Sequence, residues 1–341
     1  MKTKTILVTG GAGYIGSHTT VQLLEAGFDV VVLDNLSNSH PKSLARVREI
    51  TGRNVIFVHA DLRDRVALTA LFSTYQISAV IHFAALKAVG ESQSEPLRYY
   101  ENNIVGSLCL FEAMQRAGVY SVVFSSSATV YGDQGTGQYR EDAPLAPMSV
   151  YGRTKRMVED MLCDFCAADP RWRVALLRYF NPVGAHPSGL IGEHPSGTPN
   201  NLMPFIAQVA LGKRDKLSVF GNDYPTPDGT GLRDYIHVQD LAAGHLAALR
   251  VLAQESVPMP LIINLGTGRP YSVLEVVDAF AKASGRPVPY EILGRRPGDV
   301  AVCYADPAFA RHLLGWEAKL GIEAMCADAW RWQQMNPDGY Q

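Results

Sequence analysis

The chain has few cysteines, and their spacing excludes the frameworks that cysteines usually build. Only five occur in 341 residues, at positions 109, 163, 166, 303 and 326. An odd number without a regular spacing argues against a disulfide-stapled secreted domain and is typical of a reducing compartment. Cys163 and Cys166 form a single CxxC within a helical pattern. Because no second pair accompanies it, we favour helix packing over zinc or redox use.

Long apolar runs and a strong net charge are also missing. No apolar stretch approaches the ~18 residues of a membrane span, and the N-terminal MKTKTILVTGG holds too short an apolar segment for a signal peptide. A net charge of −2 supplies no field for holding nucleic acid. We therefore expect a soluble, cytoplasmic protein without nucleic-acid or membrane partners.

Signatures of metal binding and of repeats are lacking as well. His82, His186, His194 and His237 stand in different segments, with neither HxxxH nor HExxH spacing. The tetrapeptide HPSG occurs twice but is too short for a structural repeat. We expect no metal site and no repeat architecture.

The first 180 residues alternate short β-branched runs with longer helical patterns. Six runs are typical of strands buried on both faces, namely TILVTG, DVVVLD, NVIFVHAD, AVIHFAA, SVVFSSS and RVALLRYF. Helical stretches such as 14–27 and 96–118 lie between them. This alternation predicts an α/β fold with a doubly wound parallel sheet of the Rossmann type over residues 1–180.

From residue 181 the chain becomes rich in Pro, Gly and Asn, which indicates long ordered loops at 181–201 and 221–231. Helical patterns recur near 201–212, 238–253, 272–284 and 321–335, with one short strand at PLIINLG. Since 341 residues exceed the usual limit for one core, we expect a smaller C-terminal α/β lobe over 181–341. Some exchange of chain between the two lobes is also expected.

The first predicted strand leads into a glycine-rich loop, TGGAGYIG, and then a helix. Gly11, Gly13 and Gly16 satisfy GxGxxG, and Gly10 with the last two satisfies GxxGxxG. Missing side chains let the backbone approach a pyrophosphate at the helix N-terminus. Asp34 ends the second strand, where a carboxylate accepts the ribose hydroxyls of NAD and repels the 2′-phosphate of NADP. These features predict an NAD site.

A second group of residues carries the predicted chemistry. The fifth strand ends in SSSATVYG, and parallel strands bind ligands at their carboxyl ends. Tyr151 and Lys155 in SVYGRTK lie four residues apart, on one face of a helix. A nearby ammonium and a positive nicotinamide both favour a tyrosine phenolate. We predict Tyr151 as the acid/base, Lys155 as the cation that lowers its pKa and holds the nicotinamide ribose, and Ser127 as the group that binds the reacting oxygen.

These motifs together resemble the extended short-chain dehydrogenase/reductase family. IHFAALKAVGES, LLRYFNPVGAHPSG, PNNLMP, GNDYPTPDGTGLRDYIHV and INLGTG extend the resemblance over nearly the whole chain, toward the members that epimerise UDP-hexoses at C4. The resemblance implies reversible interconversion of UDP-galactose and UDP-glucose through a 4-keto sugar, with tightly bound NAD.

The resemblance also implies binding residues. Those for NAD are Gly10, Gly13, Tyr14, Ile15, Gly16, Asp34, Asn35, Asn38, Ser39, Asp61, Leu62, Phe83, Ala84, Ala85, Lys87, Asn102, Ser127, Tyr151, Lys155 and Phe180. Those for the UDP-sugar are Lys87, Ser127, Tyr151, Asn181, Asn201, Leu202, Ser218, Val219, Phe220, Arg233, Arg296, Asp299 and Cys303. Arginine suits diphosphate because its planar guanidinium meets phosphate oxygens bidentately.

Two further properties follow from the resemblance. Members of the family imply a homodimer, formed through helices near 95–117 and 152–168. Cys303 stands where members limited to glucose and galactose tend to carry tyrosine, beside the C2 substituent of the sugar. The smaller residue implies room for an N-acetyl group and hence use of UDP-N-acetylglucosamine and UDP-N-acetylgalactosamine.

Two alternatives stay open. Dehydratases and decarboxylases of this family carry a carboxylate just after the active-site Ser or Thr, whereas Ala128 and Thr129 stand here. These residues argue for epimerisation over a sugar-nucleotide dehydratase. A non-catalytic NAD sensor on the same fold is the other alternative, against which the intact Ser127, Tyr151 and Lys155 argue.

Overall fold

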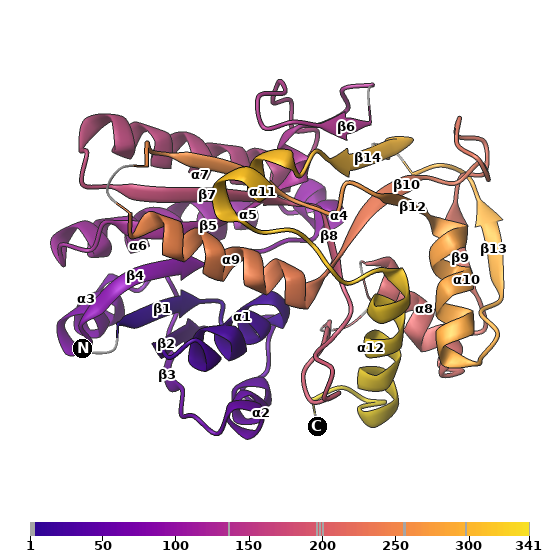
Figure 1. The fold of residues 1–341 in the computed structure, drawn as a ribbon, viewed down its shortest axis with the longest axis horizontal. Coiled ribbons are helices and arrows are strands. Elements are labelled where there is room, and N and C mark those ends of the chain that lie inside the picture. The colour runs from indigo at the N-terminus through magenta and orange to yellow at the C-terminus, as the bar shows by residue number, and fades with distance from the viewer. Residues whose placement is uncertain are drawn as a thin grey trace. The chain divides into compact units, whose positions relative to one another are not determined.

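A computed structural model describes residues 4–340 apart from positions 136, 196, 198, 200, 255, 256, 297 and 298. It contains a seven-stranded sheet in the order β11–β7–β5–β4–β1–β2–β3 (Figure 1). The strands are β1 Thr5–Thr9, β2 Asp29–Asp34, β3 Ile56–His59, β4 Ile77–His82, β5 Ser121–Ser127, β7 Arg173–Tyr179 and β11 Leu261–Leu265. The predicted α/β fold with a doubly wound parallel sheet is confirmed.

Five of the six predicted strands are buried on both faces of the sheet, as expected, whereas β3 lies at its edge with Ile56 and Phe57 exposed. Leu7, Val31 and Val80 have no exposed surface. Pairing is parallel from β5 through β4 and β1 to β2 and β3. All six predicted strands are confirmed.

The strand within PLIINLG, which we expected in the C-terminal lobe, forms instead the edge of this sheet. As β11 it lies beside β7, eighty residues distant along the chain. The apolar pattern predicts a strand but not its partner, because the choice of neighbour depends on the path of the whole chain.

Helices cover the sheet in two layers. The first set consists of α1 Tyr14–Glu25 and α2 Lys42–Thr51, which contact each other. The second consists of α3 Arg65–Thr74, α6 Gly106–Arg116 and α7 Val150–Ala168, whose apolar residues join those of five strands in one buried cluster. Right-handed crossovers account for this division, because α1 and α2 lead away from β1 along the sheet while α3 leads back to β4.

The predicted helix over 96–118 is not uniform. It consists of α5 Pro96–Tyr99, a π-helical segment Tyr100–Val105 and α6 Gly106–Arg116. A short helix, α4 Val89–Ser94, precedes it. π-Helical turns occur mostly at functional sites, and this one carries Asn102, a predicted NAD contact.

The chain divides into two compact units. One holds residues 1–132, 145–178 and 242–263, and the other holds 133–144, 179–241 and 264–341. The boundary expected near 180 corresponds to the division at 178, while 133–144 and 242–263 pass between the units. The helix α9 Val238–Leu252 contains the division between 241 and 242.

The second unit is built from short strands and helices. Its strands are β6 Gln138–Tyr139, β8 Asn181–Val183, β9 Leu217–Phe220, β10 Leu232–His237, β12 Pro270–Ser272, β13 Tyr290–Leu293 and β14 Val302–Ala305. Its helices are α8 Leu202–Ala210, α10 Val273–Ser284, α11 Ala308–Leu314 and α12 Ile322–Met335. The apolar faces of α8, α10 and α12 share one buried cluster with β9 and β10.

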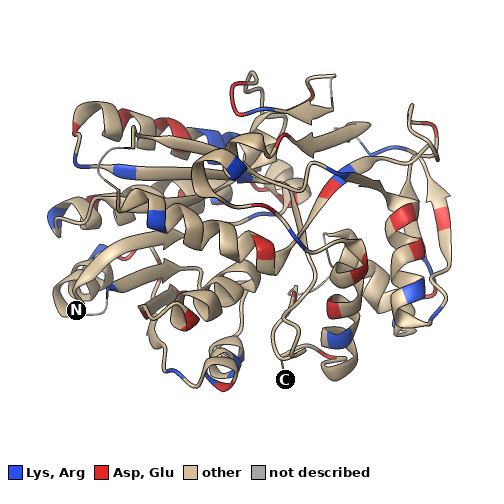
Figure 2. Cartoon of the chain, viewed as in Figure 1, with Lys and Arg blue, Asp and Glu red and all other residues tan. Residues whose placement is uncertain are grey.

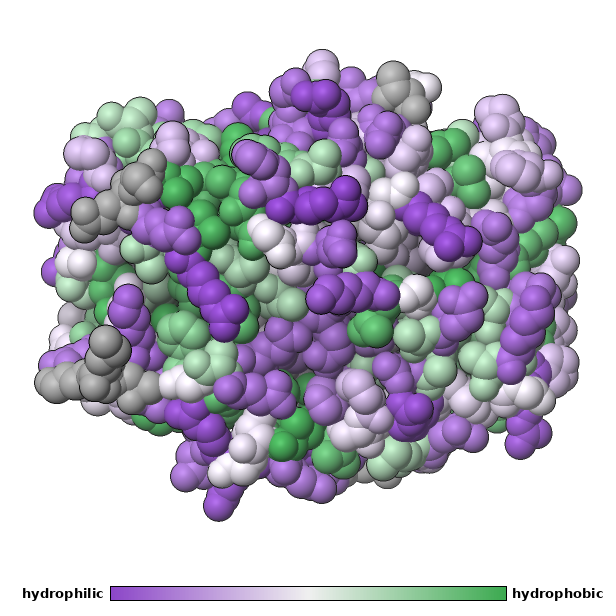
Figure 3. All heavy atoms as spheres, viewed as in Figure 1, coloured by the Kyte–Doolittle hydropathy of each residue, from purple (hydrophilic) through white to green (hydrophobic). Residues whose placement is uncertain are grey.

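Charged residues of both signs are interspersed along the chain (Figure 2). On the face drawn in Figure 3, hydrophilic residues predominate and hydrophobic ones occur in small groups. Within the described part of the chain, no helix has the length and apolar character needed to cross a membrane. The same residues contain no group of three or more His, Cys, Asp or Glu arranged to hold a metal ion.

Candidate active site

The glycine loop lies where the backbone must pass another segment closely. A Cβ atom at Gly10, whose φ is +69°, would lie 2.7 Å from the nitrogen of Ala84. A Cβ atom at Gly16 would lie 2.3 Å from the carbonyl oxygen of Gly10. No side chain caps the start of α1, so this helix N-terminus fits a pyrophosphate group. The residues present therefore fit a dinucleotide.

Asp34 braces the same loop. Its Oδ2 accepts a hydrogen bond of 3.0 Å from the nitrogen of Ala12, and its Oδ1 accepts from the nitrogen of Leu36 and the hydroxyl of Ser39. A carboxylate has about four acceptor positions, so these three bonds leave room for a further donor. Ser39, a predicted NAD contact, thus belongs to the surroundings of Asp34.

Asp61, after β3, lies beside the end of β2. Its Oδ2 accepts a 2.9 Å hydrogen bond from the Asn35 amide, which brings together two predicted NAD contacts. Hydrogen bonds from the Arg63 guanidinium hold the pKa of Asp61 well below its usual range. This carboxylate therefore stays ionised, and Asn35 is oriented by it.

The other predicted NAD contacts lie in loops around the carboxyl edge of the sheet or at helix starts. Gly13, Tyr14 and Ile15 lie at the start of α1, Asn38 after β2, Leu62 after β3, Phe83, Ala84, Ala85 and Lys87 after β4, Asn102 in the π-helical segment, and Phe180 after β7. Phe180 belongs to the second unit. The Asn102 amide donates to Asn103.

Tyr151 lies in the first turn of α7, which Ser149 caps by accepting a 3.0 Å hydrogen bond from the nitrogen of Gly152. A Cβ atom at Gly152 would lie 2.9 Å from the carbonyl oxygen of Thr129. Glycine is therefore required where α7 starts against the segment that follows β5. This close approach brings Tyr151 to the carboxyl end of β5.

Ser127 is oriented by its neighbour Thr129. The nitrogen and the hydroxyl of Thr129 both donate to Ser127 Oγ, over 3.2 and 3.0 Å. Because Ser127 Oγ accepts both hydrogen bonds from Thr129, its own hydroxyl hydrogen remains available to donate to a group other than Thr129. A hydrogen bond between Ser127 and Tyr151 acts to lower the pKa of Tyr151, so these two predicted residues are brought together.

Lys155 is buried at 4% exposure, one turn after Tyr151. Its Nζ donates a 2.6 Å hydrogen bond to the carbonyl oxygen of Ser125 and lies 4.8 Å from the centre of the Phe124 ring. The distance from Nζ to the centre of the Tyr151 ring is 5.9 Å. All three predicted catalytic residues are thus gathered between β5 and α7.

The pKa of Tyr151 is shifted in the direction opposite to the predicted one. Burial raises it to about 12, although the hydrogen bond with Ser127 works against this. The Lys155 ammonium does not offset the burial, because its nearest partner is the Ser125 carbonyl. Burial also lowers the pKa of Lys155 to about 7. The phenol is therefore the resting form of Tyr151 in the protein by itself.

In the second unit, five of the predicted substrate contacts lie close together. Arg296 donates to Asp299 over 3.0 Å, and its guanidinium lies 4.7 Å from the centre of the Phe220 ring. Arg233 lies 3.7 Å from the other oxygen of Asp299. Cys303 on β14 pairs with Arg233 on β10. An anion and an aromatic base are groups that such a cluster can bind.

A buried carboxylate holds this pair of strands in place. Asp234, with no exposed surface, accepts hydrogen bonds from the nitrogens of Thr267, Gly268 and Ala305. Its neighbours Arg233 and Tyr235 project to the other face of β10. The positions of Arg233 and Cys303 therefore depend on Asp234, a residue that no sequence motif singled out.

The remaining predicted substrate contacts differ in their surroundings. Val219 is 1% exposed and packs in the core of the unit, whereas Ser218 on the other face of β9 is half-buried. A ligand would reach Val219 through its backbone. Asn201 precedes α8, next to Leu202, and its amide donates to Glu193 over 2.7 Å. Asn181 is exposed on β8.

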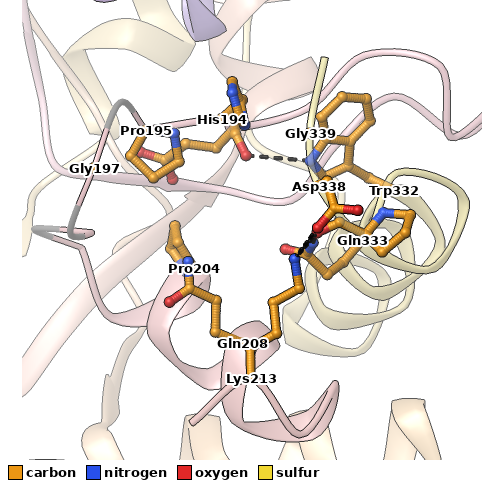
Figure 4. A pocket seen from close by; sticks show the side chains of 12 residues that line it. His194, Pro195, Gly197, Pro204, Gln208, Lys213, Trp332, Gln333, Asp338 and Gly339 are labelled. Carbon is orange, nitrogen blue, oxygen red and sulfur yellow. Dashed lines mark hydrogen bonds and ion pairs between the residues drawn. The ribbon is translucent and has the colours of Figure 1, made fainter. Parts of the chain in front are cut away.

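A polar cavity of about 260 Å³ lies elsewhere in the second unit, between α8 and the end of α12 (Figure 4). Trp332 and the ion pair of Lys213 with Asp338 line it. None of its lining residues is a predicted site residue. Glu193 lines the cavity and accepts a hydrogen bond from Asn201, which is a predicted substrate contact.

Thr129 and Ser149 were not assigned these roles from the sequence. From the sequence, Thr129 stands out only because it occupies a position where related dehydratases carry a carboxylate. A serine two residues before a helical tyrosine is a signal for an N-cap, and it could have identified Ser149. No comparable signal exists for Thr129, because its contact with Ser127 depends on the turn after β5.

Comparisons with known proteins agree with this geometry. Residues 6–266 match the model of the NAD dependent epimerase/dehydratase family. A UDP-glucose 4-epimerase of Bacillus subtilis is 61% identical over 337 residues, covering 98% of each chain. A UDP-glucose 4-epimerase of Stenotrophomonas maltophila, solved with NAD and formylated UDP-arabinopyranose, is 52% identical with a TM-score of 0.96, covering 98% of this chain and 99% of that one.

A second solved structure leads to the same family. The UDP-glucose 4-epimerase of Bifidobacterium longum, in complex with NAD+ and UDP, is 49% identical with a TM-score of 0.94. It covers 98% of this chain and 100% of its own. The matches therefore extend over both units and not only over the glycine loop. The chain belongs to the NAD dependent epimerase/dehydratase family.

Proposed function

We propose that the protein catalyses the reversible C4 epimerisation of UDP-galactose and UDP-glucose with tightly bound NAD. The observation that carries this proposal is the cluster of Ser127, Tyr151 and Lys155 between β5 and α7, with no carboxylate at the two positions after Ser127. Proton transfer at one oxygen is all that this cluster supplies. Similarity to UDP-glucose 4-epimerases over nearly the whole chain supports the same reaction.

The chain's own residues act on the O4 hydroxyl of the sugar. Tyr151 removes the O4 proton during oxidation and returns it during reduction, while Ser127 holds the same oxygen. NAD, held by the glycine loop and Asp34, would supply the acceptor and donor of the C4 hydride and a positive charge that favours the Tyr151 phenolate. In the protein by itself, burial raises the pKa of this side chain. Epimerisation then requires the keto sugar to present its other face.

The UDP portion is held by the cluster in the second unit. Arg233 and Arg296 bind the diphosphate and ribose, with Asp299 orienting both guanidinium groups. Phe220 contributes an aromatic surface to the uracil pocket. Firm contacts on UDP with few on the sugar allow the hexose to turn over while the nucleotide stays bound.

Asp34 makes the protein selective for NAD over NADP. Its carboxylate accepts from Ser39 and two backbone nitrogens and sits at the end of β2. A 2′-phosphate there would meet a negative charge. If NADP binds the nucleotide-free protein as tightly as NAD does, this role of Asp34 is wrong.

The function is tested by incubating the purified protein with UDP-galactose, without added NAD, and following the sugar by NMR. UDP-glucose is the expected product, and the Tyr151→Phe variant should form it at least about 100-fold more slowly. That variant should retain its affinity for UDP, since only one oxygen is removed. A 4-keto-6-deoxy sugar would indicate a dehydratase, and an unchanged substrate would leave the sensor alternative.

We further propose that the protein interconverts the corresponding UDP-N-acetylhexosamines. Cys303 pairs with Arg233 and is partly buried, and burial raises the pKa of its thiol to about 12, so it acts as a small apolar residue. Cys303→Tyr should remove activity on N-acetyl sugars and leave that on UDP-galactose, because the ring overfills the wall of the pocket. Wild-type protein inert toward N-acetyl sugars would contradict this.

We also propose a homodimer formed through the helices over 95–117 and 152–168. Apolar side chains are exposed on these helices, with Leu97 at 83% and Met157 at 43%. Leu108 on α6 is exposed as well. A second copy that covers these side chains removes apolar surface from water.

A further inference from the structure

A buried ion pair lies on the core side of α7 and takes no part in the reaction described above. Arg178 on β7 and Glu159 on α7 are each 2% exposed. Two hydrogen bonds join them, from Nε to Oε1 over 2.9 Å and from the terminal nitrogen to Oε2 over 2.7 Å. The Ser126 hydroxyl donates to the same Oε1 over 2.5 Å. Arg178 also donates to the Tyr131 hydroxyl over 3.2 Å.

Stability by itself does not account for this pair. Removing two charges from water costs several kcal/mol per ion, and apolar residues of similar volume often serve a core equally well. The four residues before Arg178 on β7, Val174 to Leu177, are apolar and have no exposed surface. A charged pair buried at this place therefore indicates that its charge acts on another group.

The charge that Glu159 affects is that of Lys155. The two residues are four positions apart on α7 and share one face of the helix. Burial lowers the pKa of Lys155 to about 7, and the Glu159 carboxylate acts in the opposite direction. Arg178 lies on β7, and of the two charges of the pair it is the Glu159 carboxylate, on the same helix as Lys155, that acts on the Lys155 ammonium.

The other groups around Lys155 do not replace Glu159. On its own helix stands Tyr151, which is a phenol at neutral pH. From β5 it meets the Ser125 carbonyl and the Phe124 ring. From β4 comes His82, which burial keeps neutral and whose pKa lies at about 3. From the α4–α5 side, Tyr99 packs against Tyr151 and bonds to Glu91 over 2.7 Å.

We propose that Glu159, fixed by its hydrogen bonds with Arg178 and Ser126, is a positioning residue that keeps the Lys155 ammonium charged inside the protein. Its carboxylate is fixed by both the guanidinium and the Ser126 hydroxyl, so it cannot turn away from the helix face that it shares with Lys155. Because Ser126 lies between Ser125 and Ser127 on β5, the same contact ties the carboxylate to the strand that binds Lys155. The effect of Glu159 on the charge of Lys155 does not depend on the proposed function. Only the expected change in the pH dependence of kcat rests on it.

The test measures the titration of Lys155 directly. The chain contains nine lysines, so the NMR spectrum of protein labelled at lysine Cε holds few signals. The signal that disappears in Lys155→Arg is that of Lys155. The full-length protein is used as purified, with equal nucleotide content in each variant. In Glu159→Gln we expect the midpoint of Lys155 to fall by about one pH unit or more, because the stabilising carboxylate is lost and Arg178 remains.

Two matched variants separate this effect from a loss of packing. Glu159→Gln leaves a buried unpaired charge and is expected to be unstable, whereas Glu159→Gln with Arg178→Met removes both charges. The double variant should also show a lowered midpoint, though by less than the single one. Tyr131→Phe removes a hydrogen bond from Arg178 without changing charge, and its midpoint should equal that of the wild type.

An unchanged Lys155 midpoint in both Glu159 variants would overturn the proposal. A midpoint lowered equally in Tyr131→Phe would do the same, since it would show a general packing effect. Under the proposed function, kcat falls on the alkaline side of its pH profile when Lys155 loses its proton. The pH of this fall should therefore decrease together with the titration midpoint of Lys155. If the Lys155 midpoint falls while the pH dependence of kcat is unchanged, the inference about Glu159 is supported and the catalytic role given to Lys155 is contradicted.

Discussion

Thr129 shows how one hydroxyl group directs another at the level of a single residue. Its nitrogen and hydroxyl both donate to Ser127 Oγ. Thr129→Val keeps the shape and removes one donor, so we expect kcat to fall about 2- to 10-fold, the value of one hydrogen bond, with KM unchanged. Steady-state kinetics with UDP-galactose checks this. Thr129→Ser should restore kcat, and a valine variant with full activity would show that Ser127 needs no such partner.

His82 makes the stability of the protein depend on pH. It is fully buried, with Nδ1 2.7 Å from the Thr9 hydroxyl and Nε2 2.9 Å from that of Ser107. Because burial lowers its pKa from 6.5 to about 3, the folded state prefers neutral imidazole. Its contribution is therefore complete above pH 6.5 and is lost as pH falls toward 3.

Between pH 6.5 and 5 this residue should lower the free energy of unfolding by about 2 kcal/mol. Urea titrations at the two pH values measure the change, and the matched control is His82→Gln, which cannot titrate. Between these pH values the free energy of unfolding of the variant should fall by about 2 kcal/mol less than that of the wild type. The variant should also be less stable at pH 7. Equal pH dependence in both proteins would contradict the prediction.

At the level of the secondary-structure element, the start of α7 is what aligns Tyr151 with Ser127. Ser149 caps this helix through the nitrogen of Gly152. Ser149→Ala should reduce the free energy of unfolding by about 1 kcal/mol and also lower kcat, because the first turn carries Tyr151.

Another N-cap serine provides the control for that variant. Ser272 caps α10 by accepting from the nitrogen of Glu275, whose side chain accepts in return. Ser272→Ala should reduce stability by at least as much and leave kcat at the wild-type value. Chemical denaturation and steady-state kinetics together distinguish the two. Equal losses of kcat would mean that general destabilisation, and not the direction of α7, explains the effect of Ser149→Ala.

For the whole molecule, the exposed apolar side chains on α5 to α7 predict how it assembles. Leu97→Glu places a charge among them and should convert the dimer to a monomer, because an unpaired charge is costly to bury. Light scattering coupled to gel filtration measures the mass. Val66→Glu is the control, since Val66 is 79% exposed on α3, outside the proposed interface. A Leu97→Glu protein with the wild-type mass would place the interface elsewhere.

The sequence alone was sufficient for the features that depend on local pattern. Six strands, the glycine loop and the helix that pairs Tyr151 with Lys155 follow from period, turn residues and i,i+4 spacing, and the structure contains them. Such patterns involve residues close together in the sequence, so they can be recognised without knowing which segments pack against them.

Only the tertiary structure decided what surrounds those residues. Partner choice put β11 beside β7, and burial raised the pKa of Tyr151 where the sequence indicated a fall. The pairing of Glu159 with Arg178 likewise joins a helix to a strand that begins beyond it. Burial and pairing are set by segments far apart in the chain, and electrostatic effects depend on both. For this reason the sequence could predict the candidate reacting groups, while the fold determined how they are buried and paired.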